Sequence, residues 1–358
     1  MNGDSADDPV AQLQDLLLRG RPAARESMER VREAQAAGPR ADVEHLRAAY
    51  LGLLKLCLCD LAATTTVSVG SLPGGGVASR VLRDDQRRLR SVGMDWPLQG
   101  LTMTGLQRLD DLQGCVESVV RDGVEGDLIE AGAWRGGASI LMRATLDALG
   151  DSGRTVWVAD SFQGFPVDEA GEHIDLSTYH FLAVPLDEVR DSFARFGCAD
   201  GVRFVAGFFE DTLPSLADRR WAIVRLDGDT YEATMTTLES LYPGLAPGGY
   251  LVIDDYGALE ECRRAVEDFR TRHGIEEPIE EIDWTGARWR RQSEAPIDVP
   301  RREPARPSRA AATPDREERP RDVPSVRELQ LERELSELRE RLAAAERASE
   351  RRTGLFRR

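Results

Sequence analysis

Short apolar runs alternate with helical segments in the middle of the chain, and this alternation constrains the fold more than any other feature. Five runs have the length and composition of buried strands: residues 127–133, 155–159, 202–205, 221–226 and 250–253. Helical periodicity follows at 137–149, 187–196, 231–241 and 259–272. Strands that alternate with helices need crossover connections, so we predict an α/β fold with a mostly parallel, doubly wound sheet.

Two further short runs, 279–282 and 287–290, predict a closing hairpin and complete seven strands. We assign this Rossmann-like core to residues 126–293. The preceding part, 43–125, carries helical patterns at 43–61 and 105–121 and a charged segment at 83–90, and is expected to form a helical lid or cap.

The two ends of the chain differ in composition from this unit. Residues 1–42 are polar, acidic and rich in alanine, and we interpret them as a mobile tail. Residues 294–325 are rich in proline, arginine and acidic side chains, which is typical of a disordered linker. Residues 326–358 predict a charged C-terminal helix with leucines at heptad spacing. This helix is either solvated or a docking segment for a protein partner, which it would bind as a short coiled coil.

Composition argues against two classes of partner. The formal net charge is −16, and a field of that sign repels phosphate backbones, so a nucleic-acid partner is not expected. No run of about 18 apolar residues is present, so no membrane span is expected. The N-terminal residues MNGDSADDPV lack the basic and apolar character of a signal peptide, which favours a cytoplasmic protein.

Polar side chains follow the predicted strands at the points where the strands end. In doubly wound sheets, ligands bind outside the carboxyl ends of the strands. We therefore expect the binding site among the residues at these positions: 130–137, 160–161, 207–211, 227–229 and 254–255.

The first strand ends in a glycine-rich loop, 130–137 (EAGAWRGG), that opens a helix. Glycines allow a ligand to approach the backbone closely. The Lys-Ser/Thr of a phosphate loop and the G-x-G-x-x-G of a dinucleotide site are both missing. The carboxylate of Glu130 suits a cationic or hydroxylated ligand such as S-adenosylmethionine. Asp160 could accept hydrogen bonds from the ribose hydroxyls of such a ligand. Phe208 and Phe209 could flank its base.

Three carboxylates, Asp227, Asp254 and Asp255, follow two further strands and are expected to converge. Clustered anions repel one another unless a proton or a cation intervenes, and hard oxygen ligands favour Mg²⁺ over zinc. Alternatively, Asp229, Asp254 or Asp255 could cap the helices that follow. A Mg²⁺ ion would orient and acidify a hydroxyl group for methylation, with Asp227 or His180 as the candidate base.

Seven segments, in the same order, resemble the macrocin O-methyltransferase (TylF/MycF-type) family of sugar O-methyltransferases. They are 102–105 (TMTG), 115–118 (CVES), 127–138 (DLIEAGAWRGGA), 158–164 (VADSFQG), 211–214 (DTLP), 226–229 (LDGD) and 253–256 (IDDY). The resemblance spans about residues 50–291. It implies a class I methyltransferase fold, S-adenosylmethionine and Mg²⁺ as cofactors, a glycosylated small-molecule acceptor, and a homo-oligomer.

The resemblance also implies roles for particular residues. It implies cofactor contacts from the residues Thr102, Met103, Glu130, Gly132, Trp134, Asp160, Ser161, Gly207, Phe208 and Asp227. Metal ligation falls to Asp227, Asp254 and Asp255, with Asp84 or Asp85 as the candidate for a further acidic contact from a lid.

The predicted function is methyl transfer from S-adenosylmethionine to a hydroxyl of a deoxysugar on a glycosylated natural product. The same chemistry on a nucleotide- or polysaccharide-linked sugar, or on a non-sugar diol, remains open. A third possibility is a non-catalytic scaffold that acts through the C-terminal helix, although a scaffold has no evident need for clustered carboxylates.

Overall fold

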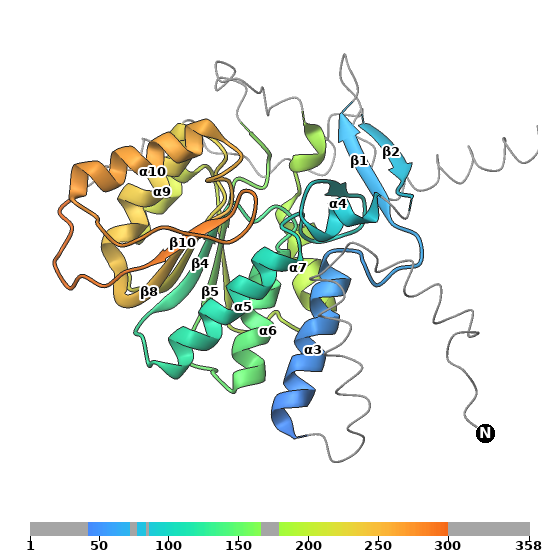
Figure 1. The fold of residues 1–358 in the computed structure, drawn as a ribbon, viewed down its shortest axis with the longest axis horizontal. Coiled ribbons are helices and arrows are strands. Elements are labelled where there is room, and N and C mark those ends of the chain that lie inside the picture. Colours follow the sequence, from blue (N-terminus) through green and yellow to red (C-terminus); the bar gives the residue numbers. More distant parts are fainter. Residues whose placement is uncertain (1–41, 72–76, 84–85, 166–178, 300–358) are drawn as a thin grey trace, which may run out of the picture.

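A seven-stranded sheet forms the centre of the computed structural model, which describes residues 42–71, 77–83, 86–165 and 179–299 (Figure 1). The strand order is β6-β5-β4-β7-β8-β10-β9. Neighbours from β6 to β8 are parallel, whereas β10 is antiparallel to both β8 and β9. The bounds are β4 Asp127–Ala131, β5 Val156–Asp160, β6 Val202–Ala206, β7 Trp221–Leu226, β8 Leu245–Ile253, β9 Glu280–Glu281 and β10 Ala287–Arg290. The predicted doubly wound sheet and its closing hairpin are confirmed.

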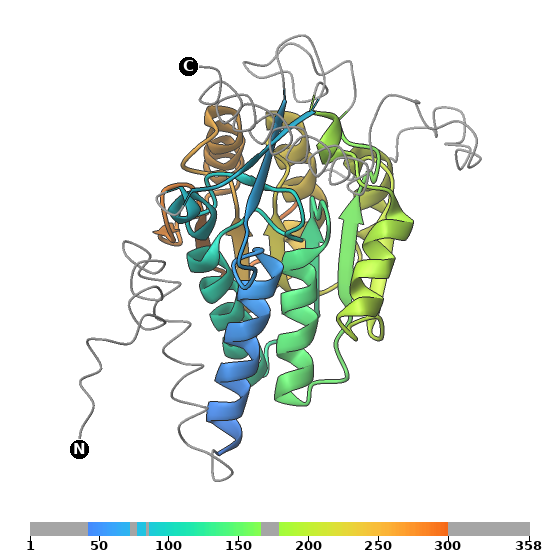
Figure 2. The same ribbon diagram turned by 90° about the vertical axis from the view of Figure 1, so that its right-hand side faces the viewer.

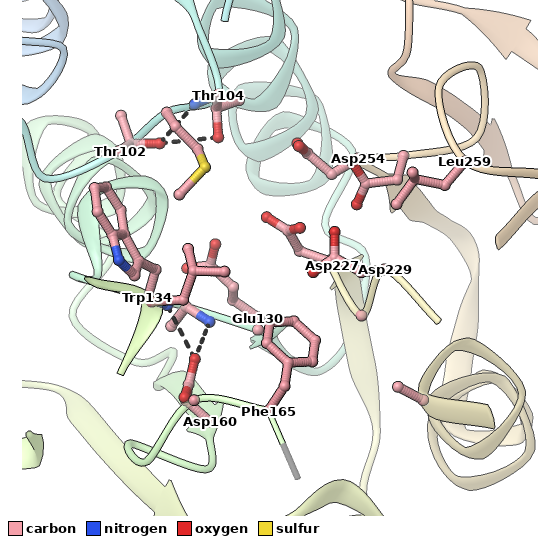
Figure 3. Close-up of a pocket in the computed structure, with 18 of the residues that line it drawn as sticks. Thr102, Thr104, Glu130, Trp134, Asp160, Phe165, Asp227, Asp229, Asp254 and Leu259 are labelled. Carbon is pink, nitrogen blue, oxygen red and sulfur yellow. Dashed lines mark hydrogen bonds between the residues drawn. The ribbon is translucent and has the colours of Figure 1, made fainter. Parts of the chain in front are cut away.

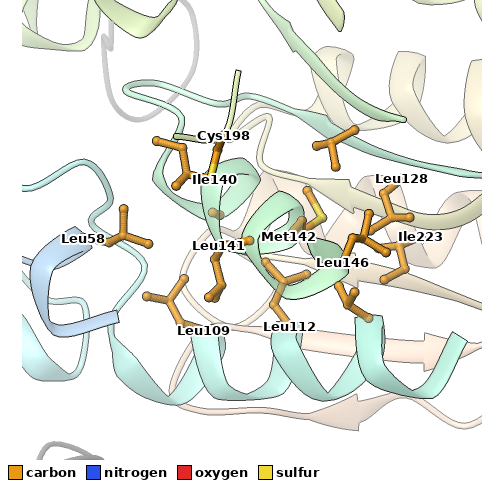
Figure 4. Packing of buried hydrophobic residues seen from close by; sticks show 14 of the residues in the cluster. Leu58, Leu109, Leu112, Leu128, Ile140, Leu141, Met142, Leu146, Cys198 and Ile223 are labelled. Atoms are coloured by element: carbon orange, nitrogen blue, oxygen red, sulfur yellow. The ribbon is translucent and has the colours of Figure 1, made fainter. Parts of the chain in front are cut away.

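Helices cover both faces of this sheet (Figures 1 and 2). One face packs against α3 (Val43–Leu58), α5 (Leu106–Arg121), α6 (Gly137–Leu149) and α7 (Leu186–Arg195). The other packs against α9 (Tyr231–Leu241) and α10 (Glu260–His273), with the short α8 (Phe209–Thr212) beside them. Apolar side chains of α5 and α6 interlock beneath the sheet in Figure 4.

The central strands are mostly apolar because helices bury them on two sides. All six residues of β7 are buried, including the charged Arg225. The carboxyl ends of β4, β5, β7 and β8 therefore meet at one edge of a rigid sheet, and the loops that leave them share one region.

The part of the chain between 43 and 125 is not helical throughout. In addition to α3, α5 and the short α4 (Arg87–Ser91), it contains a three-stranded antiparallel sheet of order β2-β1-β3 that the sequence analysis did not predict. Its strands, β1 (Val67–Ser71), β2 (Val77–Val81) and β3 (Trp96–Pro97), are short. Val67 and Val69 of β1 and Trp96 of β3 pack with Phe181 from the insertion after β5, a contact that local periodicity cannot indicate.

Several predicted features lie outside the described residues. They are the N-terminal tail 1–41, the candidate lid acids Asp84 and Asp85, most of the predicted linker, and the C-terminal helix. The first residues of the predicted linker are described, and Ile297 and Val299 pack against the core cluster under α9 and α10. No helix in the described ranges is long and apolar enough to cross a membrane.

Candidate functional site

A cavity of about 350 Å³ lies at the carboxyl ends of β4, β5, β7 and β8 (Figure 3). It contains nearly all of the site residues proposed from the sequence. Those that line it are Thr102, Met103, Glu130, Gly132, Trp134, Asp160, Ser161, Phe208, Asp227, Asp254 and Asp255. The strand-end rule therefore located the cavity correctly.

Two of the proposed residues are placed differently. Gly207 follows β6 with a φ of 138° but does not line the cavity. His180 begins a short 3-10 turn, His180–Leu182, and its side chain lies outside the described part of the structure. Its neighbours Tyr179 and Leu182 do line the cavity.

The loop between β4 and α6 is fixed by Asp160 at the end of β5. One oxygen of Asp160 accepts hydrogen bonds from the backbone N–H groups of Ala133 (2.8 Å) and Trp134 (2.9 Å), as Figure 3 shows, and the other accepts from Phe162 (2.8 Å). Burial raises the pKa of Asp160, which these hydrogen bonds oppose. Asp160 thus positions the loop, a role that the ribose interpretation had not included.

Gly132 is required by a close approach of β4 to β7. Its φ is 92°, and a Cβ at this position would lie 1.7 Å from the carbonyl oxygen of Asp227. Unusual backbone is concentrated nearby: Trp134, Phe162 and Asp229 have φ values of 48°, 56° and 58°. Such conformations cost free energy and persist where the surrounding structure enforces them, often at functional sites.

Asp227, Asp254 and Asp255 converge, as predicted. Each offers one oxygen such that all three atoms lie within 4.8 Å of one another. Burial and the charge of Asp254 raise the pKa of Asp227, and burial with the charges of Asp229 and Asp227 raises the pKa of Asp255 well above its ordinary value. The buried Oδ2 of Asp255 has no hydrogen-bond partner among the described residues.

Two buried guanidinium groups hold this acidic cluster together. Arg225 on β7 donates to Asp227 (2.9 Å), to Glu130 (2.6 Å), to Thr104 (3.0 Å) and to Asp254. Arg108 on α5 pairs with the other oxygen of Asp254. Burial alone would raise the pKa of Asp254, but the two arginines outweigh burial and lower it.

Glu130 connects the first turn of α6 to Arg225 and so to the acidic cluster. Its carboxylate accepts hydrogen bonds from Arg225 and from the hydroxyl of Ser139. Burial raises the pKa of Glu130 to about 7, although the charge of Arg225 opposes the shift. Each oxygen already has a protein partner, so a ligand could use only the remaining lone pairs of this carboxylate.

The sequence analysis missed Arg108, Arg225, Trp284 and Thr285, which belong to the same site. One signal was available for Arg225, because a single charged residue in an otherwise apolar strand must find a buried partner. Arg108 on α5 and the turn that carries Trp284 reach the cavity only through tertiary contacts.

Comparisons with known proteins agree with the fold. The family model described as Macrocin-O-methyltransferase (TylF) matches residues 71–291. The 8-demethyl-8-(2,3-dimethoxy-alpha-L-rhamnosyl)-tetracenomycin-C 4'-O-methyltransferase of Streptomyces olivaceus is 54% identical over 208 residues, which cover 56% of this chain and 79% of that protein. Mycinamicin III 3''-O-methyltransferase of Micromonospora griseorubida is 47% identical over 213 residues, 57% of this chain and 84% of that protein.

A solved structure gives the same assignment. The O-methyltransferase NovP superposes with a TM-score of 0.62 at 39% sequence identity, covering 69% of this chain and 100% of that chain. The family match covers more than half of the chain. It includes every strand of the large sheet and the residues that line the cavity. The chain is therefore an O-methyltransferase and belongs to the macrocin-O-methyltransferase (TylF) family.

Proposed function

We propose that this enzyme transfers a methyl group from S-adenosylmethionine to a hydroxyl group of a deoxysugar on a glycosylated natural product. The observation that carries the proposal is one cavity with two chemically different walls. A glycine-rich loop fixed by Asp160 forms one wall, and the acidic cluster forms the other. The sugar O-methyltransferases of Streptomyces and Micromonospora among its relatives support this acceptor class.

The cradle at β4 and β5 would hold the cofactor. The residues that we assign to it are Thr102, Met103, Glu130, Gly132, Trp134, Asp160, Ser161, Phe208 and Asp227. S-adenosylmethionine supplies an activated methyl group when bound. The chain contributes a backbone that a ligand can approach closely at Gly132.

The acidic cluster fits a hard divalent cation. Asp227, Asp254 and Asp255 offer carboxylate oxygens, which Mg²⁺ prefers, and the unpartnered Oδ2 of Asp255 gains a partner if a cation binds. Arg108 and Arg225 pair with Asp254, and Arg225 also pairs with Asp227, so a cation would share both carboxylates with these arginines. Bound Mg²⁺ would lower the pKa of a coordinated sugar hydroxyl.

In the proposed reaction, S-adenosylmethionine would supply the methyl group, and the proton of the attacked hydroxyl group would pass to a base of the chain. Asp227 is our candidate base, because it lines the cavity between the two walls and burial raises its pKa. The 2.9 Å hydrogen bond from Arg225 orients its carboxylate. His180 is the alternative base, from the turn beside the cavity.

Calorimetric titration with S-adenosylmethionine tests the cofactor assignment. We expect micromolar binding by the wild type and much weaker binding by Asp160→Ala, because the loop loses its fixed backbone contacts. Circular dichroism and thermal unfolding of the variant serve as controls for folding. Absence of binding by the folded wild type would contradict the proposal.

Turnover assays test the metal and the acceptor. We expect methylation to require Mg²⁺, to stop in excess EDTA and to be lost in Asp227→Ala. Full turnover in excess EDTA would contradict the proposed role of Mg²⁺ and leave the proposed methyl transfer standing. Rhamnosylated tetracenomycin, mycinamicin III and demethyldecarbamoylnovobiocin, taken from the names of the relatives, form the first acceptor panel.

The alternatives predict other outcomes in the same assays. Activity only on nucleotide- or polysaccharide-linked sugars, or on a catechol-type diol, would change the acceptor class and keep the chemistry. A scaffold would bind no cofactor. We also propose a homo-oligomer, which sedimentation velocity of the full chain would detect as a mass above that of the 39.6 kDa monomer.

A further inference from the structure

An exposed tryptophan stands at the wall of the cavity on the side of the acidic cluster. The Trp284 side chain lines the cavity, yet 44% of the residue is exposed. It lies in the turn between β9 and β10, whereas Asp160 and the glycine-rich loop lie at β5 and β4. In the sheet order, β7 and β8 separate these two groups. The indole therefore belongs to the wall opposite the cofactor cradle.

Hydrogen bonds fix the turn that carries this indole. Asp283 accepts from the backbone N–H groups of Thr285 (3.0 Å) and Gly286 (2.7 Å) and pairs with Arg108 (3.1 Å). The hydroxyl of Thr285 donates to the carbonyl oxygen of Asp254 (3.0 Å). The turn is thus attached directly to an element of the acidic cluster.

The indole itself is also held in place. Its Nε1–H donates to the carbonyl oxygen of Val92 (2.8 Å). The polar atom of the ring is satisfied by the protein, so the exposed remainder is a flat apolar surface. A rigid aromatic side chain with an exposed face binds a ligand with little loss of conformational entropy. Burying that face against a ligand is favourable.

We propose that Trp284 is a specificity-determining residue that packs against the apolar face of the acceptor sugar or the ring system next to it. The inference rests on the proposed function and names a recognition element for its acceptor. A pyranose ring has a face of C–H groups that can lie on an aromatic ring, while its hydroxyl groups point to the acidic cluster. The attachment of the turn through Thr285 and Arg108 sets the distance between these two contacts.

Acceptor kinetics of Trp284→Ala and Trp284→Phe test the proposal. We expect Trp284→Ala to raise the KM for a panel acceptor about fivefold with a smaller effect on kcat, since an aromatic contact of this kind is worth about 1 kcal/mol. Trp284→Phe, which keeps a ring, should recover most of the loss. The affinity for S-adenosylmethionine should stay within about twofold in both variants. Leu53→Ala removes another apolar side chain from the surface, at 51% exposure and outside the cavity wall, and is the matched control.

The outcomes separate this inference from the proposed function. An unchanged KM in Trp284→Ala, with normal wild-type turnover, overturns the inference and leaves the function standing. A wild type that methylates no member of the panel counts against the proposed acceptor class. In that case the indole ¹H–¹⁵N signal of Trp284, assigned with Trp284→Phe, is followed during titration with methyl α-L-rhamnopyranoside. A saturable shift supports the inference, and no shift overturns it.

Discussion

At the scale of single residues, Arg225 is the group on which the site depends most. Its guanidinium is buried and pairs with Glu130, Asp227 and Asp254. We expect Arg225→Met to lower the free energy of unfolding by about 3–5 kcal/mol, because it leaves buried carboxylates without their counter-charge. Urea unfolding followed by circular dichroism measures the change.

Arg121→Met is the matched control for this substitution. Arg121 also pairs with a carboxylate, that of Asp122, but its side chain is 69% exposed. Exposed pairs contribute little, so we expect a change within about 0.5 kcal/mol. Equal losses in the two variants would show that the buried network adds nothing to stability.

Glu130 gives a prediction with a defined sign in pH. Burial, opposed by Arg225, raises its pKa from 4.5 to about 7. Between these values the folded state binds more protons than the unfolded state, so this group makes the free energy of unfolding fall as pH rises. Compared with Glu130→Gln, the wild type should lose stability progressively from pH 4.5 to pH 7. A difference that stays constant across this window would contradict the assignment.

The acidic residues of the site could be predicted from the sequence, but their buried partners could not. Asp227, Asp254 and Asp255 were predictable because each directly follows a strand with a strong apolar pattern. The partners of Arg225 were not, since Glu130 lies 95 residues away in the chain and Thr104 lies 121 residues away. Pairing of buried charges depends on which strands become neighbours, and a single sequence does not state this.

At the scale of elements, the β9–β10 turn depends on the absence of a side chain at Gly286. A Cβ there would lie 2.6 Å from Cδ and 2.8 Å from Cγ of Arg108, whose head is held by Asp254 and Asp283. We expect Gly286→Ala to cost about 1–3 kcal/mol of stability, since the arginine cannot move without breaking its ion pairs. Thermal and urea unfolding measure the cost.

The control for this element is Gly114→Ala in α5. A Cβ at Gly114 meets nothing within 4 Å, and the residue is exposed within a helix. Alanine is the better helix former, so we expect a gain of about 0.5–1 kcal/mol. A Gly286→Ala variant as stable as the wild type would mean that the turn and Arg108 are not tightly coupled.

The two sheets differ in how well their strands could be predicted. The parallel strands of the large sheet, such as β5 and β7, are mostly apolar runs and could be located from their own residues. The strands of the small sheet contain glycine, serine and arginine, and β3 has two residues. Pairing with β1 and packing on Phe181 stabilise them as strands, so their own composition was a poor guide.

At the scale of the whole molecule, the described fold extends slightly beyond the family match, which ends at residue 291. Arg291 donates a hydrogen bond to the carbonyl oxygen of Ala295 (2.8 Å). Ile297 and Val299 pack against the core cluster under α9 and α10. The catalytic unit should therefore end after Val299 and not at 293, as the composition of the sequence had indicated.

Two truncations test this boundary and the scaffold hypothesis together. A chain of residues 1–299 should keep the wild-type affinity for S-adenosylmethionine, its turnover and its stability, because all elements around the cavity remain. A chain of residues 1–293 should lose about 1–2 kcal/mol of stability, since it exposes the surface that Ile297 and Val299 cover. Calorimetry, turnover assays and urea unfolding compare the two with the full chain. Loss of turnover in the chain of residues 1–299 would assign a catalytic role to residues 300–358. Intact turnover together with loss of a protein partner would show that these residues bind that partner.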